Sequence, residues 1–146
     1  MLIGIPPLLV PDLLHALASM GHGDEVVIVD ANFPAASVGR RVIDVAGANA
    51  TAVLDAVLTI LPLDTMVSPA AVTMEVVGDP RATPPAVADF AATLAARTGD
   101  ARALGHLERQ QFYERARHAF AVVRTGDTRR YANILLVKGV VRAEAT

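Results

Sequence analysis

The stretch GHGDEVVIVD, residues 21–30, decides the fold. A polar, glycine-rich turn is followed directly by Val26 to Val29, a short run of β-branched residues with no polar alternation. Such a run predicts a strand that is buried on both faces and that ends at Asp30. Because a strand buried on both sides needs a covering layer above and below its sheet, this stretch favours an α/β fold.

Helical patterns surround this strand. Pro11 to Met20 carries apolar residues at helical spacing, and Gly21 occupies the position where a left-handed residue ends a helix. Further helices are predicted by the same criteria at residues 48–61, at 83–99 with Thr83 as the capping residue, and at 109–118.

The segments between these helices predict further strands. They are expected at residues 41–45, 71–77, 119–123 and 134–137. Residues 31–37, ANFPAAS, are predicted to form a loop because they combine Asn, Pro and Ser. Helices therefore alternate with short apolar strands, which is typical of an α/β domain with helices packed on a largely buried sheet. With 146 residues, no repeat and no linker, we expect one domain spanning residues 1–146.

The composition of the chain excludes several classes of site and partner. Cysteine is absent, which excludes disulfide scaffolds, thiolate zinc sites and cysteine nucleophiles. Thirteen basic and fifteen acidic residues give a net charge of −2, without the basic stripe of a duplex-binding protein. No stretch approaches the roughly 18 apolar residues of a membrane span. The sequence therefore predicts neither a nucleic-acid nor a membrane partner, and a cytoplasmic location. Phosphate-loop, GxSxG and HExxH patterns are also missing, and no pair of candidate ligands has the i, i+3 or i, i+4 spacing that metals favour.

Two side chains beside the quoted strand are candidates for chemistry. His22 lies between two glycines, and histidine is the side chain that transfers protons in both directions near neutral pH. The alternative is a turn histidine bonded to a carbonyl. Asp30 follows the carboxyl end of the strand, where α/β sheets gather ligands; the alternative is a carboxylate that caps the next turn. An extended strand would hold the two residues roughly 20 Å apart, so a common site requires a folded-back turn or a neighbouring subunit.

Two other polar segments have simpler explanations. Residues 106–115, HLERQQFYER, mix charges in the way of a solvated helix face. The segment Tyr131-Ala132-Asn133 has the composition of an ordinary turn. His15 and His118 lie in predicted helices without a partner pattern, and we interpret them as surface or packing residues.

Taken together, three blocks resemble the RbsD/FucU family of D-ribose pyranases and L-fucose mutarotases. The blocks are GHGDEVVIVDANFP (21–34), RQQFYERA (109–116) and TGDTRRYANILLVKGV (125–140), and the resemblance spans nearly the whole chain. GHGDE, DANFP and FYERA resemble the fucose mutarotase branch more than the pyranase branch. The resemblance implies a single-domain RbsD-like layered fold and an isomerase that opens and recloses the ring of a free aldose, without cofactor or metal.

The resemblance also implies roles for particular residues and an assembly. It gives the proton donor as His22, the sugar contacts as Asp30 and Arg109, the pocket lining as Tyr131, Ala132 and Asn133, and a further candidate as Tyr113. It implies a ring-shaped homo-oligomer, such as a decamer of two pentamers, with sites near subunit contacts. We therefore expect an L-fucose mutarotase. The alternatives are a D-ribose pyranase or a mutarotase for another aldose, and a sugar-binding or regulatory subunit without turnover.

Overall fold

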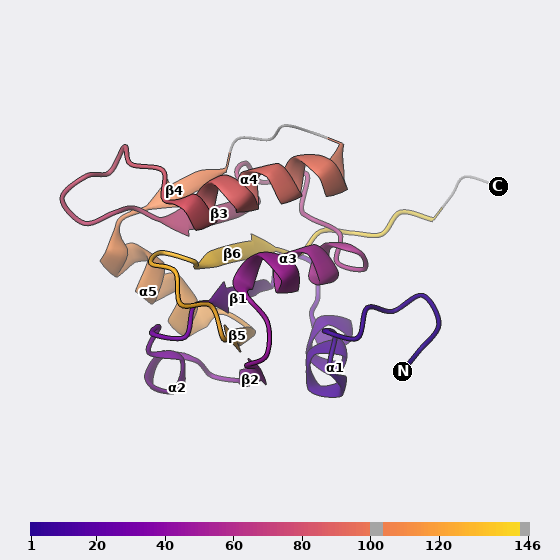
Figure 1. The fold of residues 1–146 in the computed structure, drawn as a ribbon. Helices are drawn as coiled ribbons and strands as arrows, with labels where there is room; N and C mark the ends of the chain where they lie inside the picture. The colour runs from indigo at the N-terminus through magenta and orange to yellow at the C-terminus, as the bar shows by residue number, and fades with distance from the viewer. Residues whose placement is uncertain (100–103, 144–146) are drawn as a thin grey trace.

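The computed structural model describes residues 1–99 and 104–143, which form a single α/β domain around one mixed sheet (Figure 1). The predicted boundaries, 1–146, include residues outside this described part and stay a prediction. In the described residues the sheet has six strands in the order β2-β5-β1-β6-β3-β4. Their bounds are β1 (Glu25–Val29), β2 (Val42–Val45), β3 (Ala71–Met74), β4 (Gly105–Leu107), β5 (Ala121–Thr125) and β6 (Ile134–Val137).

The direction of β6 sets the sheet apart from an all-parallel one. β1, β2 and β5 run parallel to one another, as do β3 and β4, whereas β6 lies between β1 and β3 and is antiparallel to both. Five strands therefore point their carboxyl ends toward one edge, and β6 begins at that edge. The segment that enters β6 consequently lies beside the segments that leave β1 and β3.

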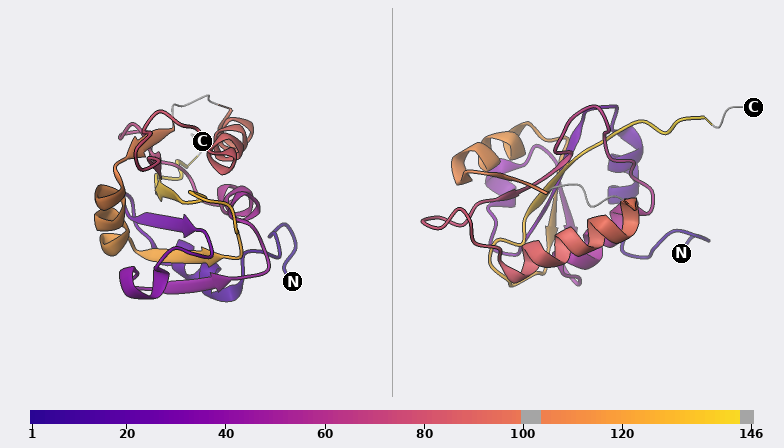
Figure 2. Two further views of the ribbon diagram at one scale, coloured as in Figure 1. Left: turned by 60° about the vertical axis from the view of Figure 1, so that its left-hand side comes forward. Right: turned by 90° about the horizontal axis from the view of Figure 1, so that it is seen from above.

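Helices cover both faces of the sheet, as Figure 2 (left) shows. Their bounds are α1 (Pro11–Ser19), α2 (Ala35–Val38), α3 (Ala50–Leu58), α4 (Pro85–Thr98) and α5 (Arg109–His118). α1, α3 and α4 pack on one face, where Val26 and Ile28 of β1 point. α2 and α5 pack on the other, against Val27 and Val29. These four valine and isoleucine residues of β1 are fully buried, which confirms the predicted strand with two buried faces.

Several expectations about element ends are wrong, for local reasons. The predicted loop 31–37 contains the start of α2. Gly21 does not end α1 in a left-handed conformation, because the extended Met20 ends the helix and the positive φ falls on Gly23, at 85°. Thr83 does not cap α4. That helix begins at Pro85 after an extended Pro84, in keeping with the extended conformation favoured before a proline. The end of α4 at Gly99, with φ 65°, is as predicted.

The strand β4 was not expected from the sequence. Its residues Gly105, His106 and Leu107 show neither alternation nor a β-branched run, and the strand is only three residues long. It pairs with β3 alone, at the edge of the sheet. Gly105 is required there, because a Cβ atom would lie 2.2 Å from the Pro69 side chain. β5 also begins and ends two residues later than predicted.

No helix in residues 1–99 and 104–143 has the length and apolar character needed to cross a membrane.

Two nearby glycines allow a test of how tightly the loop after β5 is packed. A Cβ atom on Gly126 would lie 2.1 Å from the backbone oxygen of Ala46, whereas one on Gly47 would meet nothing within 4 Å. We expect Gly126→Ala to lower the free energy of unfolding by about 1–3 kcal/mol, because backbone must move to make room. Gly47→Ala should not lower it. Denaturant unfolding compares the two, and equal stabilities would contradict the close approach.

Candidate active site

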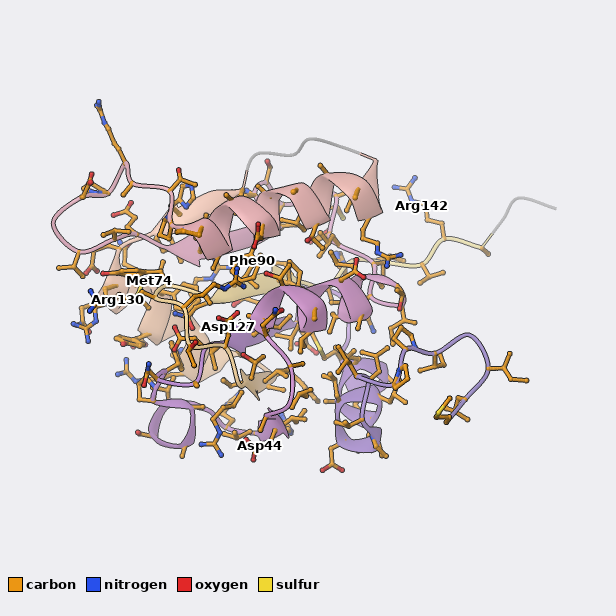
Figure 3. The ribbon with its side chains drawn as sticks, in the orientation of Figure 1. Asp44, Met74, Phe90, Asp127, Arg130 and Arg142 are labelled. Atoms are coloured by element: carbon orange, nitrogen blue, oxygen red, sulfur yellow. The ribbon has the colours of Figure 1, made fainter. Side chains whose placement is uncertain are left out.

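A cavity of about 440 Å³, lined by polar and apolar side chains, opens at the edge where the parallel strands end. Asp30 lines it from the end of β1, and Met74 from the end of β3. Arg109 enters from the start of α5, and Asn133 immediately precedes β6. Figure 3 labels Met74 and Arg130, both lining residues, at this end of the molecule. The volume is in the range of small-molecule sites, and the location is the one that α/β sheets use for ligands.

Asp30 and Asn133 form the buried floor of the cavity. The backbone N–H of Asp30 donates to Oδ1 of Asn133 at 2.9 Å, and Oδ1 of Asp30 accepts from the backbone of Asn32 at 2.9 Å. Burial raises the pKa of the Asp30 carboxyl above its ordinary value, against the opposing effect of hydrogen bonds from Asn32, Phe33 and Asn133. A fixed, largely desolvated carboxyl of this kind suits hydrogen bonding to ligand hydroxyl groups.

Tyr131 lines the cavity in a strained backbone conformation. Its φ is 59°, in the left-handed region that non-glycine residues seldom adopt. The Tyr131 hydroxyl accepts a hydrogen bond from the backbone N–H of Val77 at 3.1 Å, which links the loop before β6 to the segment after β3. Ala132 is fully buried, with its side chain in the core under α1, α3 and α4, so any contact it makes with a ligand would come from its backbone.

α5 contributes a cationic and aromatic wall. The Arg109 guanidinium lies 5.3 Å from the centroid of the Tyr113 ring and donates to the Tyr113 hydroxyl at 3.5 Å. The Tyr113 ring in turn lies 5.3 Å from that of Phe33, and both line the cavity. Aromatic faces accept the C–H groups of a sugar, and a guanidinium offers several fixed donors to its hydroxyls.

The loop before β6 is held by a partly buried ion pair, between Asp127 and Arg129, that the sequence did not predict. Asp127 is 3% exposed and accepts hydrogen bonds from the Arg129 guanidinium and from the backbone of Ala50. Arg129 also donates to Asp89 at 2.7 Å and to Thr51 at 2.9 Å. The loop is thereby tied to α3 and to α4. Figure 3 labels Asp127 next to α3. A Gly-Asp pair after a strand is a common turn signal, but the partners of Asp127 come from distant elements.

His22 lies at the opposite edge of the sheet from the cavity. It precedes β1, whereas Asp30 follows it, and the turn at residues 21–24 is hydrogen-bonded to the end of β6 rather than folded back toward Asp30. The His22 side chain is 43% exposed, and its Nε2 atom is 3.2 Å from Oδ1 of Asp64, a buried residue that the sequence reasoning missed. The structure of one chain therefore brings together every predicted cavity residue except His22 and the side chain of Ala132.

The other histidines lie apart from the cavity lining. His15 and His118 are exposed on their helices, and Nδ1 of His106 is 2.7 Å from the Thr73 hydroxyl. Within residues 1–99 and 104–143, no three histidine or acidic side chains are grouped so as to hold a metal ion.

The sequence blocks around this geometry match a known family. The model of the RbsD / FucU transport protein family matches residues 3–141. The chain belongs to the RbsD/FucU family. The three blocks that carried the resemblance contain cavity-lining residues, the segment that enters β6 and the turn with His22.

Individual relatives agree with this assignment to the RbsD/FucU family. The chain is 47% identical over 144 residues to the fucose mutarotase of Homo sapiens, an alignment that covers 94% of this chain and 93% of the human one. The crystal structure of the fucose mutarotase from Streptococcus pneumoniae in complex with L-fucose superposes with a TM-score of 0.90 at 42% identity, covering 97% of this chain and 100% of that one. The structure of Bacillus subtilis RbsD complexed with D-ribose, at 21% identity and a TM-score of 0.71 over 90% and 94% of the two chains, shares the fold.

The Asp127–Arg129 pair can be tested through stability. Arg129→Met leaves a buried carboxylate without its guanidinium, so the free energy of unfolding at neutral pH should fall by about 1–3 kcal/mol. The matched Arg124→Met removes an exposed pair with Asp44 and should cost about 0–1 kcal/mol.

The same pair predicts a pH dependence. Burial alone would raise the pKa of Asp127, but hydrogen bonds from Arg129 and Ala50 outweigh it and hold the folded-state pKa below the ordinary 3.8. The stabilisation is therefore complete above pH 3.8 and is lost as the pH falls through the lower folded-state pKa. The stability difference between wild type and Arg129→Met should shrink in that range. A difference that stays constant down to about pH 2 would contradict this account.

Proposed function

We propose that this chain is an L-fucose mutarotase, an isomerase that interconverts the α and β anomers of the free sugar. The observation that carries the proposal is the cavity built from Asp30, Arg109, Asn133 and the aromatic side chains, in a chain 47% identical to a fucose mutarotase over 94% of its length. D-ribose is the less favoured substrate, because the chain is 21% identical to the RbsD that was solved with D-ribose and 42% identical to the fucose mutarotase that was solved with L-fucose.

The reaction requires two proton transfers, and it inverts the anomeric carbon without changing the composition of the sugar. A base removes the proton of the anomeric hydroxyl, and an acid delivers a proton to the ring oxygen as the bond between the anomeric carbon and that oxygen breaks. The resulting aldehyde rotates, and closure on its other face reverses both transfers. Histidine is suited to such work because its two protonation states coexist near neutral pH. We assign the proton-donor role to His22.

The cavity residues hold the sugar hydroxyls in this proposal. Asp30 and Asn133 offer fixed oxygen atoms at the floor, and Arg109 offers guanidinium donors from the wall. Tyr113 and Tyr131 supply aromatic faces beside them, and Ala132 offers backbone groups.

The position of His22 supports a site shared between subunits. His22 is exposed at one edge of the sheet and the cavity opens at the other, so a single chain cannot apply both to one sugar. A head-to-tail contact, in which one edge meets the opposite edge of a neighbouring copy, would unite them, and such contacts form a ring when the rotation between copies closes. We propose a homo-oligomer of this kind, for which a decamer of two pentamers is the expectation. The cytoplasmic location stays a prediction.

The activity is tested by NMR saturation transfer between anomers, with purified protein added to L-fucose or to D-ribose. We expect faster α/β exchange for fucose, and in a folded His22→Ala variant a loss of about 10²-fold or more, which is typical of a removed acid–base group. Binding without acceleration for any aldose would favour the sugar-binding subunit instead. Acceleration for ribose alone would favour the pyranase.

Mixing two inactive variants tests whether the site is shared. His22→Ala and Arg109→Gln each lack one half of the proposed site. If the halves come from different subunits, oligomers unfolded and refolded together should contain some sites with both wild-type halves and should recover part of the activity. The negative control is His22→Ala unfolded and refolded alone. Gln110→Ala, one residue further along α5 and exposed, should be active unmixed. Absence of recovery in mixed oligomers, or a monomer by light scattering, would contradict the shared site.

A further inference from the structure

We propose that Arg129 is a positioning residue for the sugar, which acts through Asp127 to hold Asp30 and the segment 131–133 around the cavity. The ligand in this role is the aldose of the proposed function, on which the inference rests. Arg129 itself lines the cavity, so its guanidinium has the location of a direct hydrogen-bond donor to sugar hydroxyls. Its hydrogen bonds give it a different role.

The Arg129 guanidinium is already engaged by protein groups. Its Nε and Nη2 atoms donate to the two oxygens of Asp127 at 3.1 and 2.8 Å, a bidentate contact that fixes the orientation of a guanidinium. Nη1 donates to Asp89 at 2.7 Å, and Nη2 also donates to the Thr51 hydroxyl at 2.9 Å. These contacts occupy most of the five N–H donors of an arginine, so the side chain has little left to offer a ligand.

The backbone of Asp127 is fastened to the end of β1 on both sides of Asp30. The Asp127 carbonyl accepts from the N–H of Ala31 at 2.9 Å. The Thr125 hydroxyl accepts from the N–H of Asp127 at 3.2 Å and donates to the carbonyl of Val29 at 2.8 Å. Val29 and Ala31 are the two chain neighbours of Asp30. A displacement of Asp127 would therefore displace the residue that carries the buried carboxyl of the cavity floor.

The side chain of Asp127 fixes the start of the segment that leads to Asn133. Its Oδ1 atom accepts from the backbone N–H of Arg129 at 2.9 Å, and its Oδ2 atom accepts from the N–H of the first residue of α3 at 2.9 Å. At the other end of the segment, Oδ1 of Asn133 accepts from the backbone of Asp30 at 2.9 Å. Tyr131, with its φ of 59°, thus lies between two anchored residues.

This preformed arrangement should act on sugar affinity. Groups that are ordered before a ligand arrives do not have to be ordered during binding, which otherwise weakens the complex. Without the Arg129 guanidinium, the loop would lose its links to α3 and α4, and part of its ordering would fall on the binding step. Proton transfer should be affected less, because His22 lies at the opposite edge of the sheet.

Calorimetric titration with L-fucose and NMR anomer exchange at saturating L-fucose separate these two effects. We expect Arg129→Met to raise the Kd for L-fucose about tenfold, whereas the exchange rate at saturation changes less than roughly twofold. Arg129→Lys is the second variant if the methionine variant does not fold. It keeps a positive charge beside Asp127 but cannot make the bidentate contact, so the Kd should rise in this variant as well.

Arg97→Met is the matched control. Arg97 also joins α4 to α3, through hydrogen bonds to Asp55 at 2.6 and 2.7 Å, but neither residue lines the cavity. This variant should keep the wild-type Kd and exchange rate. Amide hydrogen exchange reports on the positioning itself. The Ala31 amide, which donates to Asp127, should exchange faster in Arg129→Met and at the wild-type rate in Arg97→Met.

The outcomes separate the role of Arg129 from the proposed function. A wild-type Kd in both Arg129 variants, or an equal rise in Arg97→Met, would overturn the positioning role. A raised Kd with unchanged exchange of the Ala31 amide would make Arg129 a direct sugar ligand and would overturn it too. A wild-type protein that binds L-fucose but accelerates anomer exchange for no aldose would instead overturn the proposed function. The Kd and amide measurements would still decide the role of Arg129.

Discussion

The hydrogen bonds of β6 are the constraint on which both groups of candidate residues depend. β6 is antiparallel to its neighbours β1 and β3, so its beginning lies where they end and its end lies where they begin. The entry to β6 brings Asn133 to Asp30, and its exit brings the Gly23 turn to the Asp64 segment. One apolar strand of four residues, fully paired on both sides, therefore holds two polar sites at opposite edges of the sheet.

Buried polar groups give the cavity its rigidity. Asp30 and Asp127 are both almost fully buried, and each accepts hydrogen bonds from the protein itself. Burying a carboxyl is costly unless it is hydrogen-bonded, so these groups favour the one loop arrangement that supplies their donors. That same arrangement holds Tyr131 in a conformation that its own backbone disfavours. The backbone strain at Tyr131 is thus offset by the hydrogen bonds of Asp30 and Asp127.

The sequence predicted what is local and missed what depends on tertiary contacts. α5 and β6 have the predicted bounds, because a helical pattern and a continuous apolar run each signal their element without outside help. β4 was missed because Gly105–Leu107 is a strand only through its pairing with β3. The sequence predicted the separation of His22 from Asp30, because it follows from the length of one extended strand. The sequence did not predict the contact of Asp64 with His22 or that of Arg129 with Asp89, since each contact joins segments that are distant in the chain.

The ammonium group of Lys138 has a chemical consequence of its own. It is the single lysine of the chain, and its Nζ atom donates to the carbonyls of Leu17 and Met20. Open-chain sugars are aldehydes, which condense with unprotonated amines to imines and then to stable glycation adducts. An amine engaged with two backbone carbonyls is held away from such an aldehyde. With arginine at its twelve other basic positions, the chain offers a reducing sugar very little side-chain amine.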